Sequence, residues 1–268
     1  MIVFRRAVLP RTSRYSGQII RARAKVNRGH LIFSRRRTTI RFRFAIIRES
    51  HPRAVSIMII DDIGLWCQID YTDAAGRPAL FLDRDGVIVA DTHYLGRAED
   101  MRLLEGAGAA IARCNALRIP VVVVTNQSGI ARGYFDWDGF RAVQEALSNA
   151  LLAVGAHIDA VFACAYHADG SQHLRIAGHP WRKPNPGMIL TAGNRMNIEL
   201  SRSWIIGDRM HDMAAGMAAG LAGGTLLMPA NHEIGEVPAL ANDHFVVETA
   251  PSLAHAVAAL IEIGRLVR

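Results

Sequence analysis

The sequence predicts an α/β fold in which helices cover both faces of a mainly parallel sheet. Short, uncharged apolar runs such as residues 79–82 and 121–124 are typical of parallel strands that are buried on both faces. These runs alternate along the chain with longer stretches of helical periodicity. Such an alternation favours a Rossmann-like, doubly wound sheet, which we expect to form one domain over residues 77–268.

The expected elements follow in chain order. Strands are predicted at residues 79–83, 120–125, 160–165, 204–208 and 225–228. Helices are predicted at residues 106–117, 136–154, 186–196, 210–219 and 252–266. Asp136 is a suitable N-cap for the second helix, Pro186 suits the first turn of the third, and Gly220 can end the fourth. Only a loop joins residues 86 and 106, so we expect no large cap domain.

The net charge of +7 conceals two oppositely charged segments. Residues 1–53 contain fourteen arginines, one lysine and one acidic residue, so the rest of the chain is net acidic. We expect residues 1–76 to be a basic, disordered N-terminal extension, with Met58 as an alternative start. Within it, an apolar–basic alternation at residues 39–44 predicts a short strand or hairpin. The competing interpretation is a basic arm that binds nucleic acid or anionic lipid.

Cysteine usage and hydropathy indicate the compartment. Cys67, Cys114 and Cys164 are too few and too far apart for a disulfide framework, which favours a reducing cytoplasm. No apolar run reaches the roughly 18–20 residues of a membrane span, and the N-terminus lacks the apolar core of a secretory signal. We therefore expect a cytoplasmic protein without a membrane span. The oligomeric state stays open, a monomer included.

Two carboxylates stand directly after the first strand. Asp83 and Asp85 are two residues apart and point the same way on an extended backbone, and Gly86 lets the chain turn away. Two carboxylates this close need a cation or a shared proton. Mg²⁺ is the natural cation because it prefers hard oxygen ligands and helps to hold phosphates. One carboxylate can then attack phosphorus while the other handles the proton of the leaving group.

Three further polar clusters lie at the ends of later strands. The cluster 125–129 offers the Thr125 hydroxyl and backbone N–H groups to a phosphoryl oxygen. Lys183 is the only lysine outside the N-terminal segment, and as a compact cation it can neutralise a transferring phosphoryl group. Asp208 ends the fourth strand as a further Mg²⁺ ligand, and Asp212 follows one helical turn later. Each cluster alone could be structural, but together, at one edge of the sheet, they predict an active site.

These four motifs resemble those of the haloacid-dehalogenase (HAD) superfamily of phosphohydrolases, and the resemblance covers about residues 79–250. Within the superfamily, residues 125–133 and 182–188 are similar to the D-glycero-D-manno-heptose 1,7-bisphosphate phosphatases. The related histidinol-phosphate phosphatases share the framework but usually lack the continuation at residues 128–133.

The resemblance implies a role for each motif. Asp83 would be the nucleophile that forms an aspartyl-phosphate, and Asp85 the general acid/base. Thr125 and Lys183 would stabilise the phosphoryl group. Mg²⁺ would be held by Asp83, by the backbone carbonyl of Asp85 and by Asp208. Substrate contacts are implied for Asp91, Thr92, His93, Tyr94, Asn126, Gln127, Ser128, Arg182 and Arg209. Position 209 is usually lysine in the family, and we interpret His211 as a surface or core histidine.

One loop departs from the family pattern. The family commonly binds a structural zinc ion in the loop before the Arg-Lys-Pro motif, and the matching positions here are Cys164, Tyr166, His179 and Trp181. Only Cys164 and His179 ligate zinc readily, although His167 and His173 lie near them in the sequence. We expect no zinc, with Tyr166 and Trp181 packing the loop instead.

The predicted function is that of a Mg²⁺-dependent phosphomonoesterase of carbohydrate metabolism. The expected substrate is a sugar bisphosphate such as D-glycero-D-manno-heptose 1,7-bisphosphate. The first alternative keeps the chemistry and changes the substrate to histidinol phosphate or another small phosphorylated molecule. The second is a nucleic-acid- or membrane-associated protein with a recruited HAD module, although we expect no nucleic-acid partner for the core.

Overall fold

The computed structural model describes residues 25–27, 30–35, 38–43, 57–61, 63–70, 74–228 and 244–266. The chain divides into two compact units, residues 1–52 and 53–268. The first unit contains an antiparallel sheet of β1 (Lys25–Asn27), β2 (His30–Arg35) and β3 (Thr38–Arg43). Strand β3 confirms the strand expected at residues 39–44. The remainder of the basic segment, which we expected to be disordered, lies outside the described residues.

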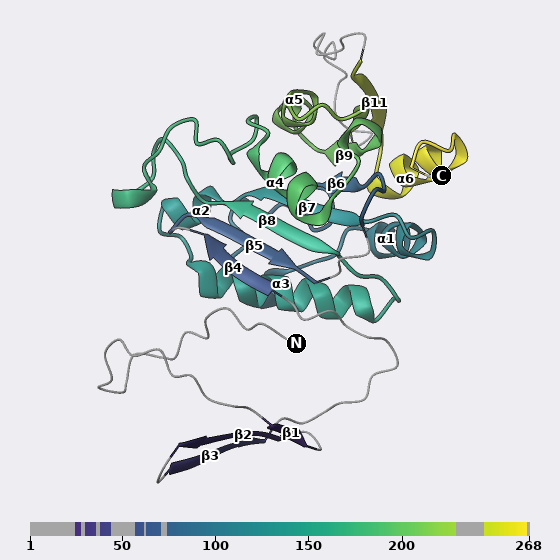
Figure 1. Ribbon diagram of the computed structural model, residues 1–268. Coiled ribbons are helices and arrows are strands. Elements are labelled where there is room, and N and C mark those ends of the chain that lie inside the picture. Colours follow the sequence, from purple (N-terminus) through teal and green to yellow (C-terminus); the bar gives the residue numbers. More distant parts are fainter. Residues whose placement is uncertain are drawn as a thin grey trace. The chain divides into compact units, whose positions relative to one another are not determined.

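The second unit is built on an eight-stranded sheet with the order β11-β10-β9-β6-β7-β8-β5-β4 (Figure 1). Its six parallel strands are β6 (Leu80–Leu82), β7 (Val121–Asn126), β8 (Ala160–Cys164), β9 (Trp204–Gly207), β10 (Gly223–Leu227) and β11 (Val246–Ala250). The chain between β6 and the first long helix forms loops and one short 3-10 turn, so no cap domain follows the first motif. The predicted fold is therefore confirmed.

Helices cover both faces of this sheet, as the uninterrupted apolar strands require. Side chains that alternate along β6 and β7 divide the core into two layers. Leu80 and Val121 pack toward the face of α1 (Ala107–Ala116), α3 (Trp137–Leu152) and α6 (Leu253–Glu262). Phe81 and Val122 pack toward the face of α4 (Gly187–Met196) and α5 (Met210–Ala218). The short helix α2 (Ser128–Ala131) follows β7. Within the described residues, no helix has the length and apolar character needed to cross a membrane.

The second unit begins before the boundary that we expected at residue 77. Strand β5 (Leu65–Ile69) pairs antiparallel with β8, and β4 (Ile57–Asp61) pairs antiparallel with β5. The buried Trp66 ring stacks on Trp137 with centroids 5.6 Å apart and meets the edge of Phe140 at 5.3 Å. Residues 57–69 are thus part of the sheet and not a lead-in to it. The apolar runs within residues 57–69 are short and show neither a clear alternation nor a turn motif between them. The sequence therefore did not indicate that they would pair with β8.

Strand β11 was also missed. It carries Glu248 and Thr249 and leaves three of its five residues partly buried, as suits an edge strand with one exposed side. The parallel register nevertheless holds across the centre of the sheet, because Leu82 lies opposite Val123 on β7 and Ile206 on β9. The carboxyl ends of β6, β7 and β9 therefore lie side by side, and the residues that follow them meet at one edge.

Candidate active site

A buried lysine joins two carboxylates at the centre of this edge. Lys183 Nζ lies 2.9 Å from Asp83 Oδ2 and 2.6 Å from Asp212 Oδ1, and it donates to the carbonyl of Val124 at 2.9 Å. All three charged side chains are buried. Loss of the ammonium would leave two buried carboxylates uncompensated, which is strongly destabilising. Lys183 therefore stabilises both carboxylates in their buried positions. The only lysine of the acidic part of the chain thus pairs with Asp83 and Asp212, and its contact with a phosphoryl group stays a prediction.

Negative charge exceeds positive charge around this lysine. Burial raises the pKa of Asp83 above its ordinary value, although the Lys183 ammonium opposes the rise. Burial lowers the pKa of Lys183, but the attraction of Asp212 and Asp83 outweighs it and the net direction is upward. Burial, with repulsion from Asp83 and Asp212, raises the pKa of Asp208 to about 7. A surplus of carboxylates in a partly desolvated site suits a hard divalent cation.

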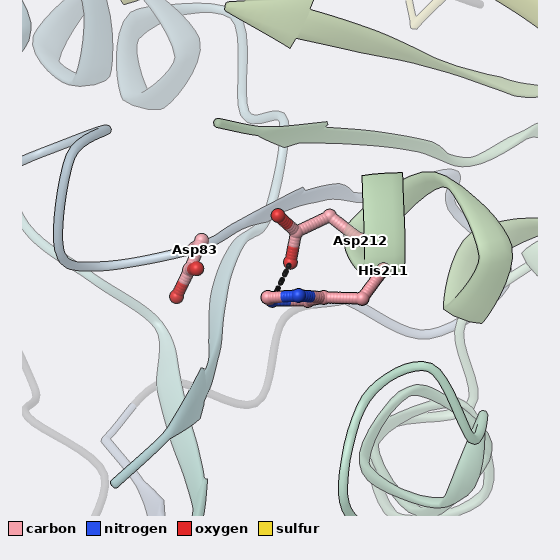
Figure 2. Close-up of side chains that lie close together, drawn as sticks. All are labelled: Asp83, His211 and Asp212. Carbon is pink, nitrogen blue, oxygen red and sulfur yellow. Dashed lines mark ion pairs between the residues drawn. The ribbon is translucent and has the colours of Figure 1, made fainter. Parts of the chain in front are cut away.

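The three side chains in Figure 2 are close enough to suggest a different metal site. Ligand atoms of Asp83, His211 and Asp212 all lie within 4.8 Å of one another, and His211 Nε2 is 3.6 Å from Asp212 Oδ1. Lys183, however, already bridges the two carboxylates of this group. Burial, and then repulsion by Lys183, lowers the pKa of His211 to about 4. His211 therefore lies beside Asp83 as a neutral ring, closer to the site than we expected, and the cation between Asp83 and Asp212 is the lysine.

The second aspartate faces a different set of partners. Asp85 accepts two hydrogen bonds from Arg84, at 3.1 Å and 3.0 Å, and one from Gln127 Nε2 at 2.9 Å. Gln127 Nε2 also lies 2.9 Å from Thr125 Oγ1. Gln127 is 4% exposed, and its side chain contacts Asp85 and Thr125; its role as a substrate contact stays a prediction. All three bonds to Asp85 end on its side-chain oxygens, and none of them uses its backbone carbonyl.

Arg84 and Gln144 are residues that sequence reasoning missed. Arg84 is fully buried, and its guanidinium also donates to Gln127 and Gln144. An arginine between two aspartates looks like a solvated neighbour, and a glutamine in the middle of α3 carries no signal at all. Their hydrogen bond joins residues that are 60 positions apart in the sequence, so only the tertiary structure brings them together.

Backbone geometry fixes the spacing of the motifs. Gly86 has φ +78°, and a Cβ atom there would come within 2.5 Å of Asp208 Oδ2. Asn126 closes a two-way clasp with Lys183, donating to its carbonyl at 3.0 Å and accepting from its N–H at 3.1 Å. The Asn126 side chain therefore ties the second motif to the backbone of the third, and the turn at Gly86 brings the first motif close to the fourth.

The expected substrate residues other than Gln127 are exposed or half-buried, and we call them the rim residues. Arg209 reaches from the start of α5 to Asp91 at 3.2 Å and lies 3.7 Å from Asp208. Thr92, His93 and Tyr94 are exposed on the same loop. The half-buried Arg182 donates to the carbonyl of Tyr166 at 3.2 Å, and Ser128 begins α2.

The loop that differs from the family is packed with rings. Tyr166 is buried and stacks on His179 at 4.3 Å, and Trp181 lies 5.9 Å from Phe162. Cys164 Sγ is 4.0 Å from His179 Nδ1, and burial raises the pKa of this thiol to about 11. Among the residues that the structure describes, no third histidine, cysteine or carboxylate joins Cys164 and His179 as a ligand group. The absence of zinc stays a prediction, which elemental analysis of the purified protein can test.

An aspartate pair after the central strand, a buried lysine and an acidic cluster after β9 define the class of this protein as a HAD-like hydrolase. Residues 180–248 match the family described as HAD-hydrolase-like. A D-glycero-beta-D-manno-heptose-1,7-bisphosphate 7-phosphatase from Mesorhizobium japonicum is 53% identical over 150 residues, which span 56% of this chain and 69% of the relative.

Two solved structures share the fold. One, from Mesorhizobium loti and assigned as a HAD-like phosphatase, superposes with a TM-score of 0.70 at 41% identity, covering 78% of this chain and 97% of that chain. The other is D,D-heptose 1,7-bisphosphate phosphatase from B. bronchiseptica complexed with magnesium and phosphate, with a TM-score of 0.61 at 29% identity over 69% of this chain and 99% of that chain. The chain belongs to the heptose-bisphosphate phosphatase family of HAD-like phosphoric monoester hydrolases.

Proposed function

We propose that this enzyme removes the 7-phosphate of D-glycero-D-manno-heptose 1,7-bisphosphate through an aspartyl-phosphate on Asp83. The observation that carries the proposal is the placement of a buried, lysine-paired Asp83 beside an Asp85 held by separate partners. The two carboxylates have different environments, and different environments let two chemically identical groups take different roles. The names of the relatives supply the substrate.

The reaction proceeds in two displacements. An oxygen of Asp83 attacks phosphorus, the bond from phosphorus to the sugar oxygen breaks, and Asp85 gives its proton to that oxygen. A water molecule then attacks the phosphorus, Asp85 takes back a proton, and the bond to Asp83 breaks. The Lys183 ammonium and the Thr125 hydroxyl stabilise charge on the phosphoryl oxygens.

The residues present fit a magnesium ion. Asp83, Asp208 and the backbone carbonyl of Asp85 would hold it, and the carboxylate surplus described above is the feature that it would neutralise. When bound, Mg²⁺ would supply a positive charge that orients the phosphate and stabilises the developing negative charge. Asp212 is not needed as a ligand, because Lys183 already neutralises it.

The rim residues favour a polar substrate of some size. Arg182 and Arg209 offer guanidinium groups for a second phosphate, and the loop of Asp91 and His93 offers acceptors for sugar hydroxyls. Because no cap domain follows β6, these rim residues are not covered by an inserted domain. Histidinol phosphate is a second substrate to test, but no contact in the site favours it.

The proposal is tested by measuring phosphate release from both anomers of the heptose bisphosphate and from histidinol phosphate. Each substrate is tested with Mg²⁺ and with a chelator. We expect Mg²⁺-dependent release of one phosphate per heptose molecule and a clear preference for the heptose. Asp83→Asn should lower the rate by at least about 10³-fold without unfolding. Asp138→Asn, which changes a surface carboxylate of α3, is the matched control and should leave the rate unchanged.

Two results would count against the proposal. Undiminished turnover by Asp83→Asn would exclude this residue as the nucleophile. Equal turnover of all three substrates would keep the phosphatase and remove the assignment of the heptose.

A further inference from the structure

Arg84 makes an unusual set of contacts for a residue between two catalytic aspartates. Its side chain is fully buried, and its guanidinium carbon lies 5.1 Å from the centre of the Phe140 ring. The Nε and Nη2 atoms grip both oxygens of Asp85, at 3.1 Å and 3.0 Å. Nη1 donates to Gln144 Oε1 at 3.1 Å, and Nη2 donates to Gln127 Oε1 at 3.2 Å. The buried cation is therefore hydrogen-bonded on every nitrogen.

This arrangement fixes the orientation of one carboxylate. A planar guanidinium that grips both oxygens of a carboxylate permits little rotation about the last side-chain bond, unlike a lysine, which acts as a point charge. Gln127 adds a third bond to the same oxygen that Nη2 holds. The Asp85 side chain keeps 24% of its surface exposed, so the carboxylate that Arg84 and Gln127 hold is still accessible from outside the core.

Gln144 connects the Arg84 guanidinium, which holds Asp85, to helix α3. It is buried in the middle of α3, a sixteen-residue helix whose other buried residues pack into the main core. The guanidinium thus has two anchors. It donates to Gln144 in α3 and to Gln127, which directly follows β7. The backbone of the loop that carries Asp85 is anchored by the buried residues Val87 to Val89, and the guanidinium adds contacts to the Asp85 side chain itself.

We propose that Arg84 is a positioning residue that aims the Asp85 carboxylate at the leaving oxygen and, in the second step, at the attacking water. The inference rests on the proposed function, because it assigns Arg84 a role only through the acid/base role of Asp85. The backbone N–H of Arg84 separately donates to Asp83 Oδ1 at 2.7 Å, and a side-chain substitution leaves that bond available. Loss of the side chain should therefore affect Asp85 more than the nucleophile.

The test exploits the need for a proton at the leaving group. In the first step the Asp83–phosphorus bond forms and the bond to the leaving oxygen breaks. An alkoxide leaving group needs the proton of Asp85, whereas 4-nitrophenolate departs without one. Misaiming Asp85 should slow the first step for an alkyl phosphate such as the heptose bisphosphate. It should spare that step for 4-nitrophenyl phosphate and slow only the hydrolysis of the aspartyl-phosphate.

Arg84→Met is the principal variant, because methionine keeps much of the buried stem. We expect kcat for the alkyl phosphate to fall about 100-fold, while KM changes little. With 4-nitrophenyl phosphate, rapid mixing should show a burst of nitrophenolate at the wild-type rate, followed by slow steady-state turnover. Gln144→Leu removes one anchor of the guanidinium and should give the same pattern with a smaller loss.

Two controls separate positioning from folding and from the chemistry of Asp85. Arg265→Met removes another arginine that lies over an aromatic ring, 4.6 Å from the centre of Trp204, and pairs with Glu248 at 3.3 Å. It should cost stability without changing the ratio of alkyl to aryl activity. Asp85→Asn should show the full leaving-group dependence, because it removes the acid itself.

The outcomes separate the two proposals. If Asp85→Asn raises the dependence on the leaving group and Arg84→Met does not, the positioning role is wrong and the proposed function stands. If Asp85→Asn leaves that dependence unchanged, the acid/base assignment fails and the inference fails with it. If Arg84→Met lowers alkyl and aryl turnover equally, with loss of the burst, its role is structural only.

Discussion

The individual carboxylates in this site differ in the cation that lies next to each of them. Asp83 and Asp212 share a buried lysine, Asp85 has an arginine fork, and Asp208 has Arg209 at 3.7 Å as its near cation. Asp208 is consequently the carboxylate with the weakest local compensation, and burial and like charges raise its pKa to about 7. Its ionisation should therefore be visible in the pH dependence of stability.

The first prediction concerns Asp208 in protein freed of metal by a chelator. Between pH 4 and 7 the folded state holds the Asp208 proton more tightly than the unfolded chain does, because the pKa of this carboxyl is raised from 3.8 to about 7. Its contribution to the free energy of unfolding therefore falls as pH rises through this range. Relative to wild type, Asp208→Asn should gain stability progressively from pH 4 to 7, measured by urea unfolding at each pH.

The comparison between the two proteins is needed because other groups titrate in the same range. His211, whose pKa burial and Lys183 lower to about 4, makes the opposite contribution, so the slope of wild type alone is not diagnostic. Addition of Mg²⁺ at pH 7.5 should stabilise wild type and have little effect on Asp208→Asn. A difference in stability that stays constant with pH would contradict the prediction.

At the scale of elements, the turn after β6 determines how closely the first and fourth motifs approach. Gly86 combines a left-handed backbone with a close approach to Asp208, so a side chain there meets two separate penalties. Gly155 has φ +73° after the end of α3, with nothing within 4 Å of a Cβ atom. The two glycines allow the two penalties to be measured apart.

The second prediction is that Gly86→Ala lowers both stability and activity, whereas Gly155→Ala lowers stability only. Each should lose about 1–2 kcal/mol from the left-handed conformation of a residue with a Cβ atom. Gly86→Ala should lose more in stability and at least about tenfold in kcat/KM, because the methyl group displaces the Asp208 carboxylate. Thermal unfolding and initial rates in Mg²⁺ measure the two effects. Equal kcat/KM for the two variants would show that the approach to Asp208 has no functional weight.

At the scale of the whole molecule, the catalytic unit includes the hairpin of β4 and β5. These strands cover the edge of β8, and Trp66 fills the space above Trp137 and Phe140. Without them β8 would present unpaired backbone groups and an uncovered aromatic layer, which promotes association between chains.

The third prediction compares two shortened proteins. A chain of residues 53–268 should fold and retain the full rate of phosphate release, because every residue of the described site belongs to the second unit. A chain of residues 77–268 should be unstable or aggregate, since the loss of Trp66 alone corresponds to about 3–5 kcal/mol. Thermal unfolding and light scattering measure this, with Trp66→Ala in the longer chain as the control for the aromatic contact. A stable, active 77–268 chain would show that the sheet ends functionally at β8.

The same shortened proteins test the role of the basic segment. If 53–268 retains activity but loses a salt-dependent affinity for DNA or anionic vesicles that the full chain has, residues 1–52 carry a separate binding function. If neither protein binds these ligands, the basic arm has no such role.

The sequence by itself determined the fold class and the four motifs, three of which stand at the carboxyl ends of strands, whereas the third, at Lys183, shortly precedes α4. Apolar β-branched runs can only be buried in a covered parallel sheet, and the residues that follow such runs must gather at one edge. The isolated Lys183 was also readable, because arginine is otherwise the cation of this chain. The tertiary structure alone decided how these residues are partnered. Arg84, Gln144 and Trp66 act through contacts between segments that are distant along the chain, and no local periodicity encodes which buried polar group will satisfy another.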